Sequence, residues 1–251
     1  MAERVMGVLG GMGPEATVAF LARVVALTPA VRDQDHLRVV VDCNPKIPDR
    51  TAAIQGRGPS PLPMLAASVE ALGRAGAEFI AIPCVSAHAF IDELVRLVSL
   101  PILSILDVVA TGVASDRRGY RTVGLLGTSG TIEAGLFERR LVEAGLDVVR
   151  PRVGDQRLVG DVIYRIKADL SPATRRAATR TLRAVATRLV ASGAQAVVLG
   201  CTELPLALGP SQTRVPLFDS LEMLARAAVR EAGREPRSAG AGDAAGPGGA
   251  S

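Results

Sequence analysis

The chain has 251 residues, of which 48% are hydrophobic, 3% aromatic and 22% charged, and its formal net charge is +4. This composition excludes an intrinsically disordered chain, because it supplies enough apolar side chains to build a core. Charged residues, glycines and prolines interrupt the apolar runs well before the roughly 20 residues that a membrane-spanning helix needs. We therefore expect a soluble globular protein with no membrane partner.

Cysteines are few, and the basic residues are spread along the chain. Cys43, Cys84 and Cys201 stand far apart, so the sequence predicts neither a disulfide scaffold nor a metal site. Free thiols and a start unlike a signal peptide favour the cytoplasm. The low aromatic content favours solvated arginine-bearing helix faces over a surface that binds nucleic acid.

Short β-rich apolar runs alternate with longer helical patterns along the chain, which is typical of a parallel α/β sheet. Strands are expected at residues 5–9, 37–42, 79–82, 122–126, 148–149 and 196–199. Helices are expected at residues 14–27, 62–75, from about 87, 132–144, 173–191 and 221–231. Residues 234–251 are mostly Gly, Ala, Pro and Ser, and we expect a disordered tail there.

An internal repeat relates the two halves of the chain. The motif GVLG at residues 7–10 recurs as GLLG at 124–127, and GAEFIAIPC at 76–84 aligns without a gap with GAQAVVLGC at 193–201. Both repeats have the same offset of 117 residues, so Cys84 and Cys201 are equivalent. We expect two pseudo-symmetric, Rossmann-like α/β halves facing each other across a cleft. They would span residues 1–114 and 115–220, with the helix at 221–231 completing the first.

Glycine-rich segments join a strand to a helix at residues 10–14 and 127–131. Backbone N–H groups at such a junction can hold an anion, and in parallel α/β sheets ligands bind beyond these strand ends. The first segment also matches a loose dinucleotide-binding pattern, GxGxxA, with Asp42 at the end of the next strand. Tight turns without a ligand are the third interpretation.

Cys84 and Cys201 each end an apolar strand, where a cysteine by itself is commonly a small buried hydrophobe. Their equivalence in the repeat favours another interpretation, because symmetric halves would place the two sulfurs on opposite sides of one bound molecule. One thiolate could then remove a proton from a carbon while the other thiol delivers one to the opposite face. The free-thiol pKa of about 8.5 suits this task, and we expect helix N-termini to lower it.

Other candidates are weaker by themselves. Two prolines stiffen the predicted loop at residues 44–51, which would fix Arg50 for a carboxylate; the alternative is a solvated cation. Lys167 is one of two lysines and could bind a ligand or lie on the surface. We expect His88 to orient the loop after Cys84 more readily than to act as a base, and Cys43 to be a packing residue.

Taken together, these motifs resemble the Asp/Glu racemase family, in its aspartate racemase branch that works without pyridoxal phosphate. The matching segments are GVLGGMGPEAT at 7–17, NPKIPDRT at 44–51, PCVSAH at 83–88, GTSGT at 127–131, IYRIK at 163–167 and LGCTELP at 199–205. They extend from about residue 5 to residue 230, in the order of the family.

The resemblance implies roles for particular residues, no cofactor, and a homodimer. Cys84 and Cys201 would be the acid/base pair, and Arg50 and Lys167 would bind the side-chain carboxylate. The remaining candidates surround the α-carboxylate and the amino group: Ser86, Thr128, Gly130, Thr131, Thr202 and Glu203. The family usually has Asn and Thr after the first cysteine, whereas this chain has Val85 and Ser86. Ser86 keeps a hydroxyl, and Val85 replaces an amide that faces the substrate in the family.

We therefore expect cofactor-independent racemisation of a small acidic amino acid, with aspartate as the first candidate substrate. A related isomerase or decarboxylase of a maleate- or malonate-type dicarboxylate is the alternative within the superfamily. A non-catalytic carboxylate-binding protein is the alternative outside it. The two cysteines favour the racemase, since single-cysteine decarboxylation and simple binding do not need both.

Overall fold

The structure is a computed structural model that describes residues 3–238, and it contains two four-stranded parallel sheets. In the first sheet the order is β2-β1-β3-β4, with bounds Met6–Gly10 for β1, Val39–Cys43 for β2, Phe79–Ala81 for β3 and Ile102–Leu103 for β4. In the second the order is β6-β5-β7-β8, with bounds Thr122–Leu126, Asp147–Val149, Ala196–Leu199 and Leu217–Asp219 for β5 to β8. The predicted α/β class with two equivalent parallel sheets is confirmed.

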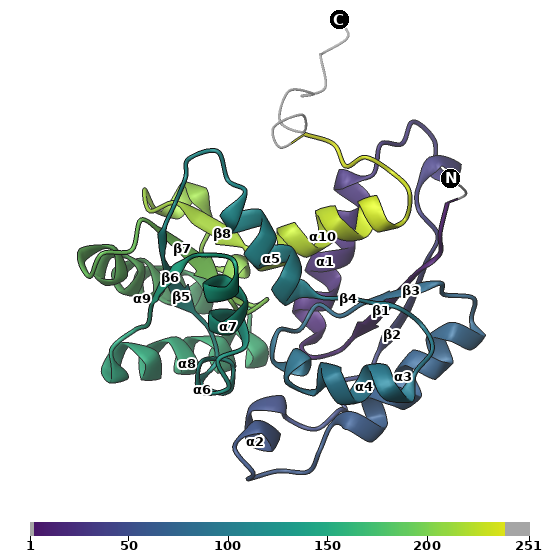
Figure 1. The fold of residues 1–251 in the computed structure, drawn as a ribbon, viewed down its shortest axis with the longest axis horizontal. Coiled ribbons are helices and arrows are strands. Elements are labelled where there is room, and N and C mark those ends of the chain that lie inside the picture. The colour runs from purple at the N-terminus through teal and green to yellow at the C-terminus, as the bar shows by residue number, and fades with distance from the viewer. Residues whose placement is uncertain (1–2, 239–251) are drawn as a thin grey trace, which may run out of the picture.

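Ten α-helices connect and cover these strands within the described residues. They are α1 (Pro14–Leu27), α2 (Arg50–Ile54), α3 (Leu62–Arg74), α4 (Ile91–Leu97), α5 (Ile105–Ala114), α6 (Ser129–Glu133), α7 (Leu136–Glu143), α8 (Val153–Ala168), α9 (Pro172–Ala191) and α10 (Ser220–Glu231). Helices α1, α5 and α10 lie between the two sheets (Figure 1). Over residues 3–238, no helix combines the length and apolarity that crossing a bilayer requires.

The repeated glycines have a structural reason. Gly76 follows α3 and Gly193 follows α9, and their φ angles of 93° and 104° fall in the region that favours glycine. Each glycine ends the helix that leads into one of the two inner strands of its sheet, β3 or β7. The repeat therefore encodes the same helix-to-strand turn in both halves, and the same strand order follows.

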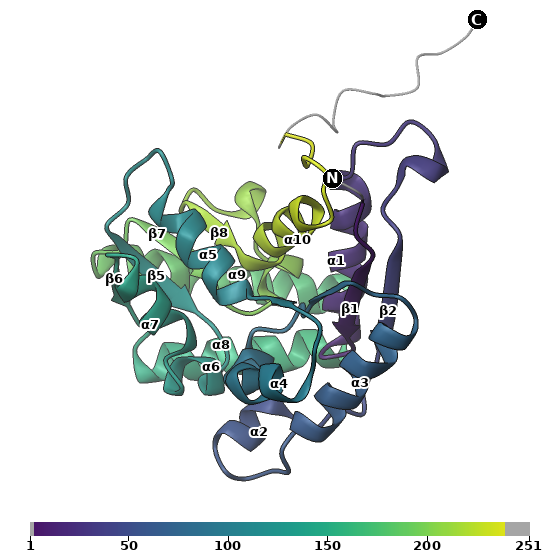
Figure 2. The ribbon, with the colours of Figure 1, turned by 45° about the vertical axis from the view of Figure 1, so that its right-hand side comes forward.

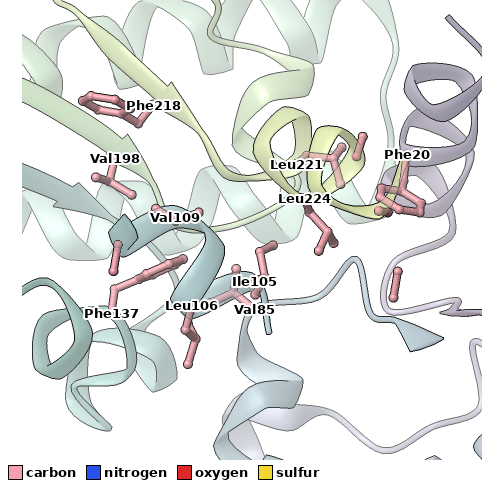
Figure 3. Close-up of a cluster of buried hydrophobic side chains, with 14 of the residues drawn as sticks. Phe20, Val85, Ile105, Leu106, Val109, Phe137, Val198, Phe218, Leu221 and Leu224 are labelled. Carbon is pink, nitrogen blue, oxygen red and sulfur yellow. The ribbon is translucent and has the colours of Figure 1, made fainter. Parts of the chain in front are cut away.

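The largest apolar cluster joins the two halves. It contains Phe20 of α1, Val109 of α5, Phe137 of α7 and Leu221 of α10, all fully buried, together with side chains from both sheets. Figure 3 shows these side chains around α5 and α10. A second cluster packs α8 and α9 on the second sheet, and a third packs α3 on the first. The division of the chain near residue 115 remains a prediction.

Several predicted elements differ in the structure. The helix expected at 132–144 is interrupted by Gly135, whose φ of 60° separates α6 from α7. The predicted loop at 44–51 ends in the short helix α2, because Asp49 caps it by accepting the backbone N–H of Ala52 at 2.7 Å. Strands β4 and β8 and helices α5 and α8 were not predicted, although α8 buries Val159, Val162, Ile163 and Ile166 at helical spacing.

The predicted tail is partly described. The backbone N–H of Arg237 donates to the Leu27 carbonyl at 2.8 Å, and the Arg234 guanidinium contacts Glu3 at 2.9 Å. These contacts join Arg234 to the N-terminal segment and Arg237 to α1, and the disordered tail remains a prediction. The rest of that prediction, residues 239–251, lies outside the described residues.

Candidate active site

A pocket lies beyond the carboxyl ends of β3 and β7, where the two halves meet. It is lined by Met12, Asp49, Arg50, Thr51, Cys84, Val85, Ser86, Thr128, Tyr164, Lys167, Cys201, Thr202 and Glu203. This list contains all but two of the site residues expected from the sequence. The exceptions are Gly130, which lies beside Thr51, and Thr131, whose hydroxyl contacts that of Thr128. The fold therefore collects candidates from both halves of the chain in one place.

The two cysteines come together through equivalent positions. Cys84 follows β3 and Cys201 follows β7, and both are buried free thiols that line the pocket. The hydroxyl of Thr202 donates to the Pro83 carbonyl at 3.1 Å, so the two post-strand segments touch across the halves. The topology thus places both thiols at one site, as the repeat predicts.

Glu203 is the most heavily bonded side chain of the pocket. It is 1% exposed, and its Oε1 accepts from the Lys167 ammonium at 2.5 Å and from the Gly13 N–H at 3.1 Å. Its Oε2 accepts from the Cys201 thiol at 2.9 Å and lies 3.4 Å from the Thr202 hydroxyl. A buried carboxylate is stabilised only when donors and a counter-charge surround it, and here both are present.

This arrangement changes the expected role of the first glycine-rich loop. The Gly13 N–H lies at the N-terminus of α1, where binding of a ligand anion was one of the three interpretations of the loop. In the structure the group at this N–H is the carboxylate of Glu203, from the other half of the chain. The positive end of α1 therefore helps to hold a buried acid of the protein itself.

Glu203 also shapes the ionisation of its neighbours. Burial raises the pKa of the Cys201 thiol well above its usual range, and the negative charge of Glu203 raises that pKa further. Burial by itself would lower the pKa of Lys167, but the charges of Glu203, Cys201 and Cys84 outweigh it and raise the pKa. The expected lowering of the thiol pKa by a helix N-terminus is thus wrong for Cys201, which a turn and not an α-helix follows.

Three buried hydroxyls form a separate cluster, of which those of Ser86 and Thr128 line the pocket. The oxygens of Thr128 and Thr131 lie 3.0 Å apart, and that of Ser86 lies 3.3 Å and 3.4 Å from them. Thr128 also caps α6 by accepting the Thr131 N–H at 3.1 Å. Gly130 allows α2 to approach, since a Cβ there would lie 3.1 Å from the Thr51 Cα. The cluster offers hydroxyl donors from both halves.

Arg50 is held in place by backbone carbonyls. Its guanidinium donates to Ile47 at 3.1 Å, to Pro48 at 3.0 Å and to Met12 at 3.3 Å, while its buried Nε has no hydrogen-bond partner among residues 3–238. The same Met12 carbonyl accepts from Lys167 at 3.1 Å. The Met12 carbonyl therefore holds both predicted substrate-binding cations, Arg50 and Lys167. A contact through a backbone oxygen leaves no pattern in the sequence.

Asp49, Thr51 and Tyr164 also line the pocket but were not singled out from the sequence. The phenol of Tyr164, on α8, donates to the Asp49 carboxylate, whose oxygens lie at 3.3 and 3.4 Å. This contact joins the start of α2 in one half to α8 in the other. Asp49 and Thr51 belong to the same NPKIPDRT segment as Arg50, so their proximity to it was the available signal.

Val85 serves the core as well as the pocket. It is 2% exposed and belongs to the large apolar cluster, beside Ile105 and Leu106 (Figure 3). Because this position carries an apolar side chain, the wall next to Ser86 offers no side-chain hydrogen bond there. The pocket is accordingly less polar at Val85 than the usual Asn would make it.

His88 orients the segment after Cys84, as expected. Its Nδ1 lies 3.0 Å from the Cys84 carbonyl, and its Nε2 lies 3.3 Å from the Ile105 N–H that donates to it. The ring is 2% exposed and neutral, because burial lowers the pKa of His88 to about 4. His88 does not line the pocket, so it supports the cysteine segment from behind.

The low pKa of His88 predicts a loss of stability in acid. The unfolded chain takes up this proton near pH 6.5, so the free energy of unfolding should fall between about pH 6.5 and about pH 4 and level off below. This group alone should contribute roughly 3 kcal/mol to that fall. Urea unfolding across this pH range measures it. His88→Gln should flatten the decline, and a variant with the full decline would contradict the assignment.

Comparison with known proteins agrees with this fold. The family described as Asp/Glu/hydantoin racemase matches residues 9–228. The broad-specificity amino-acid racemase RacX of Bacillus subtilis is 26% identical over 231 residues, which cover 89% of this chain and 96% of RacX.

Two solved structures are similar over nearly their whole length. The aspartate racemase of Picrophilus torridus is 30% identical with a TM-score of 0.83, over 93% of this chain and 96% of that one. An aspartate racemase homologue from Pyrococcus horikoshii is 28% identical with a TM-score of 0.72, over 92% of this chain and 100% of that one. The chain belongs to the Asp/Glu/hydantoin racemase family.

Proposed function

We propose that this isomerase racemises an acidic amino acid, with aspartate as the preferred substrate, by proton transfer between two cysteines and without a cofactor. The observation that carries the proposal is that Cys84 and Cys201, at equivalent strand ends, line one pocket with Arg50 and Lys167. The aspartate racemase of P. torridus, similar over 93% of the chain, supports the choice of substrate.

The proposed reaction is balanced with one thiolate and one thiol. The thiolate takes the proton from Cα, and the C–H electron pair moves into the α-carboxylate as an enediolate. The opposite thiol then gives its proton to the other face of Cα, so the two sulfurs exchange protonation states. The raised pKa of Cys201 suits it as the thiol that donates a proton. In the direction of reaction in which Cys201 is the donor, Cys84 is the thiolate that accepts the Cα proton.

The charge that develops on the α-carboxylate needs donors that are already in place. Ser86, Thr128 and Thr131 supply a cluster of hydroxyls for it, and Ser86 and Thr128 line the pocket. Arg50 is the better placed cation for the side-chain carboxylate, since Lys167 already pairs with Glu203. Thr202 and Glu203 would then lie near the amino group.

The direct test is an assay of the purified protein with L- and D-aspartate, without added pyridoxal phosphate or metal. We expect each enantiomer to be converted into the other and, in deuterated water, to acquire deuterium at Cα. Chiral chromatography and mass spectrometry measure both results. If folded, reduced protein leaves aspartate, glutamate and related amino acids enantiopure and free of deuterium, the proposal is wrong.

Arg50→Ala should lower kcat/KM for aspartate more than kcat/KM for alanine, because the guanidinium is assigned to the side-chain carboxylate. A charge-assisted hydrogen bond contributes about 1.5–3 kcal/mol, so we expect a loss of roughly 10- to 150-fold in kcat/KM for aspartate. Arg57→Ala, at an exposed arginine outside the pocket, is the matched control. Equal kinetics of Arg50→Ala and wild type would remove Arg50 from the substrate site.

A second candidate function follows from Val85 and the Lys167–Glu203 pair. An apolar wall and a lysine that already has a counter-charge also suit neutral amino acids, as in a broad-specificity racemase such as RacX. The same assay with a panel of neutral amino acids decides between the two. Faster conversion of neutral amino acids than of aspartate would favour this second candidate.

The family resemblance and the free thiols extend the proposal to a homodimer in the cytoplasm. Sedimentation equilibrium tests the dimer, and cell fractionation tests the location. A monomer at high concentration, or recovery of the protein outside the cytoplasm, would contradict the respective part.

A further inference from the structure

Strand β2 forms one edge of the first sheet, and over residues 3–238 no strand pairs with its outer side. Figure 2 shows β2 at the right-hand margin of this sheet. On the inner side, the Arg38 carbonyl accepts from Met6 and the Asn44 N–H donates to Gly10, which places the even-numbered residues of β2 in the ladder with β1. The backbone groups of Val39, Val41 and Cys43 therefore point outward.

This edge exposes apolar side chains and a thiol. Val41 is 39% exposed, and Cys43, expected to be a packing residue, is an exposed thiol at the end of β2. Helix α1 packs on the same face of the sheet as Val39, and its outer side exposes Val18 and Val25 at 63% and 56%. Free strand edges in native proteins are normally blocked or covered, because an open apolar edge pairs with other chains.

The residues of β2 are self-complementary when the strand is paired antiparallel with itself. Around Val40 the sequence at 37–43 reads LRVVVDC, with Arg38 two residues before the centre and Asp42 two residues after it. Pairing centred on Val40 would set Val39 opposite Val41 of the second copy, in hydrogen-bonded positions. Arg38 would lie opposite Asp42 of the second copy, and the two-fold symmetry would repeat this ion pair.

Neither charge has a strong partner within the described chain. Arg38 is exposed and makes one long contact, 3.5 Å from its guanidinium to the Ala75 carbonyl, while Asp42 makes no ion pair with any residue from 3 to 238. Other registers are less favourable. Centring on Val41 would set Asp42 against a valine, and centring on Asp42 would oppose two like charges.

We infer that β2 pairs antiparallel with β2 of a second copy of this chain, centred on Val40, and so forms one continuous eight-stranded sheet. The exposed Val41 would lose contact with water as the dimer forms. The inference names the interface of the homodimer included in the proposed function. It is independent of the reaction, since the residues involved lie outside the pocket.

Charge exchange tests both the interface and its register. Sedimentation equilibrium should find the wild type dimeric, with Arg38→Asp and Asp42→Arg each raising the dissociation constant by at least about tenfold, which corresponds to about 1.4 kcal/mol. The double variant Arg38→Asp/Asp42→Arg should recover the wild-type constant to within about threefold. Arg183→Asp, at an exposed position on α9, is the control for the change in net charge.

Thermal unfolding and the aspartate assay of each variant separate assembly from folding and from the reaction. If the wild type is a monomer and still racemises aspartate, the proposed dimer is wrong and the proposed reaction is not affected. If the wild type is a dimer and neither Arg38→Asp nor Asp42→Arg changes its dissociation constant, this interface is wrong. Failure of the double variant to recover the dimer would overturn the register centred on Val40.

Discussion

Cys84→Ser and Cys201→Ser are each expected to lower aspartate racemisation by at least about 10²- to 10⁴-fold, the range that general acid–base groups contribute. A hydroxyl is far too weak an acid to replace either thiol in a proton transfer that needs one acceptor and one donor. The remaining thiolate should still act on its own face. Each single variant is therefore expected to exchange the Cα proton of only one enantiomer with deuterium.

Deuterium incorporation at Cα, measured with each enantiomer in deuterated water, shows which thiol acts on which enantiomer. Cys43→Ser is the matched control, because Cys43 is an exposed thiol outside the pocket. Thermal unfolding of all three variants checks that the fold survives. If Cys84→Ser and Cys201→Ser stay folded and racemise at the wild-type rate, the cysteines are packing residues at strand ends and the two-base proposal is wrong.

The second large effect is expected from Glu203→Gln. The amide keeps the size of the side chain but removes the negative charge, so the Lys167 ammonium would lose its counter-charge. Breaking such a pair should lower the free energy of unfolding by on the order of 3 kcal/mol. The pKa of Cys201 should fall, because burial would still raise it but the neighbouring charge would not. Thiolate would then form at a lower pH than in the wild type.

Urea unfolding measures the free energy of unfolding of Glu203→Gln. The ultraviolet absorbance of the thiolate measures the pKa of Cys201, in a Cys43→Ser/Cys84→Ser background where Cys201 is the only cysteine that titrates. Glu143→Gln removes an exposed ion pair with Arg140 and is expected to cost less than about 1 kcal/mol. A Glu203→Gln protein with unchanged stability and an unchanged Cys201 pKa would show that the carboxylate does not carry the charge assigned to it.

Glu203 also makes the two thiols unequal despite the symmetry of the fold. Cys201 donates to this carboxylate, whereas the residue at the equivalent position after Cys84 is Ser86, which belongs to the hydroxyl cluster. The segment after one thiol thus carries a carboxylate, and the segment after the other carries a hydroxyl. Such a difference is what a reaction on an asymmetric amino acid requires of a symmetric scaffold.

The sequence by itself determined the fold class, the repeat and most of the pocket lining. These features are local: alternating apolar runs define strands and helices, and glycines such as Gly76 and Gly193 mark equivalent turns. In parallel sheets the chain segments that follow equivalent strands meet at one edge. The positions of Cys84 and Cys201 therefore followed from sequence spacing once the repeat was recognised.

Only the tertiary structure decided which partners the polar groups find. The Gly13 N–H and Lys167 meet Glu203 across 190 and 36 residues, and the Met12 carbonyl joins Lys167 to Arg50. Backbone donors and acceptors have no residue-specific signature, so no pattern in the sequence identifies these contacts. The raised pKa of Cys201 likewise depends on burial and on a charge placed by folding, which is why a local rule about helix N-termini predicted the opposite direction.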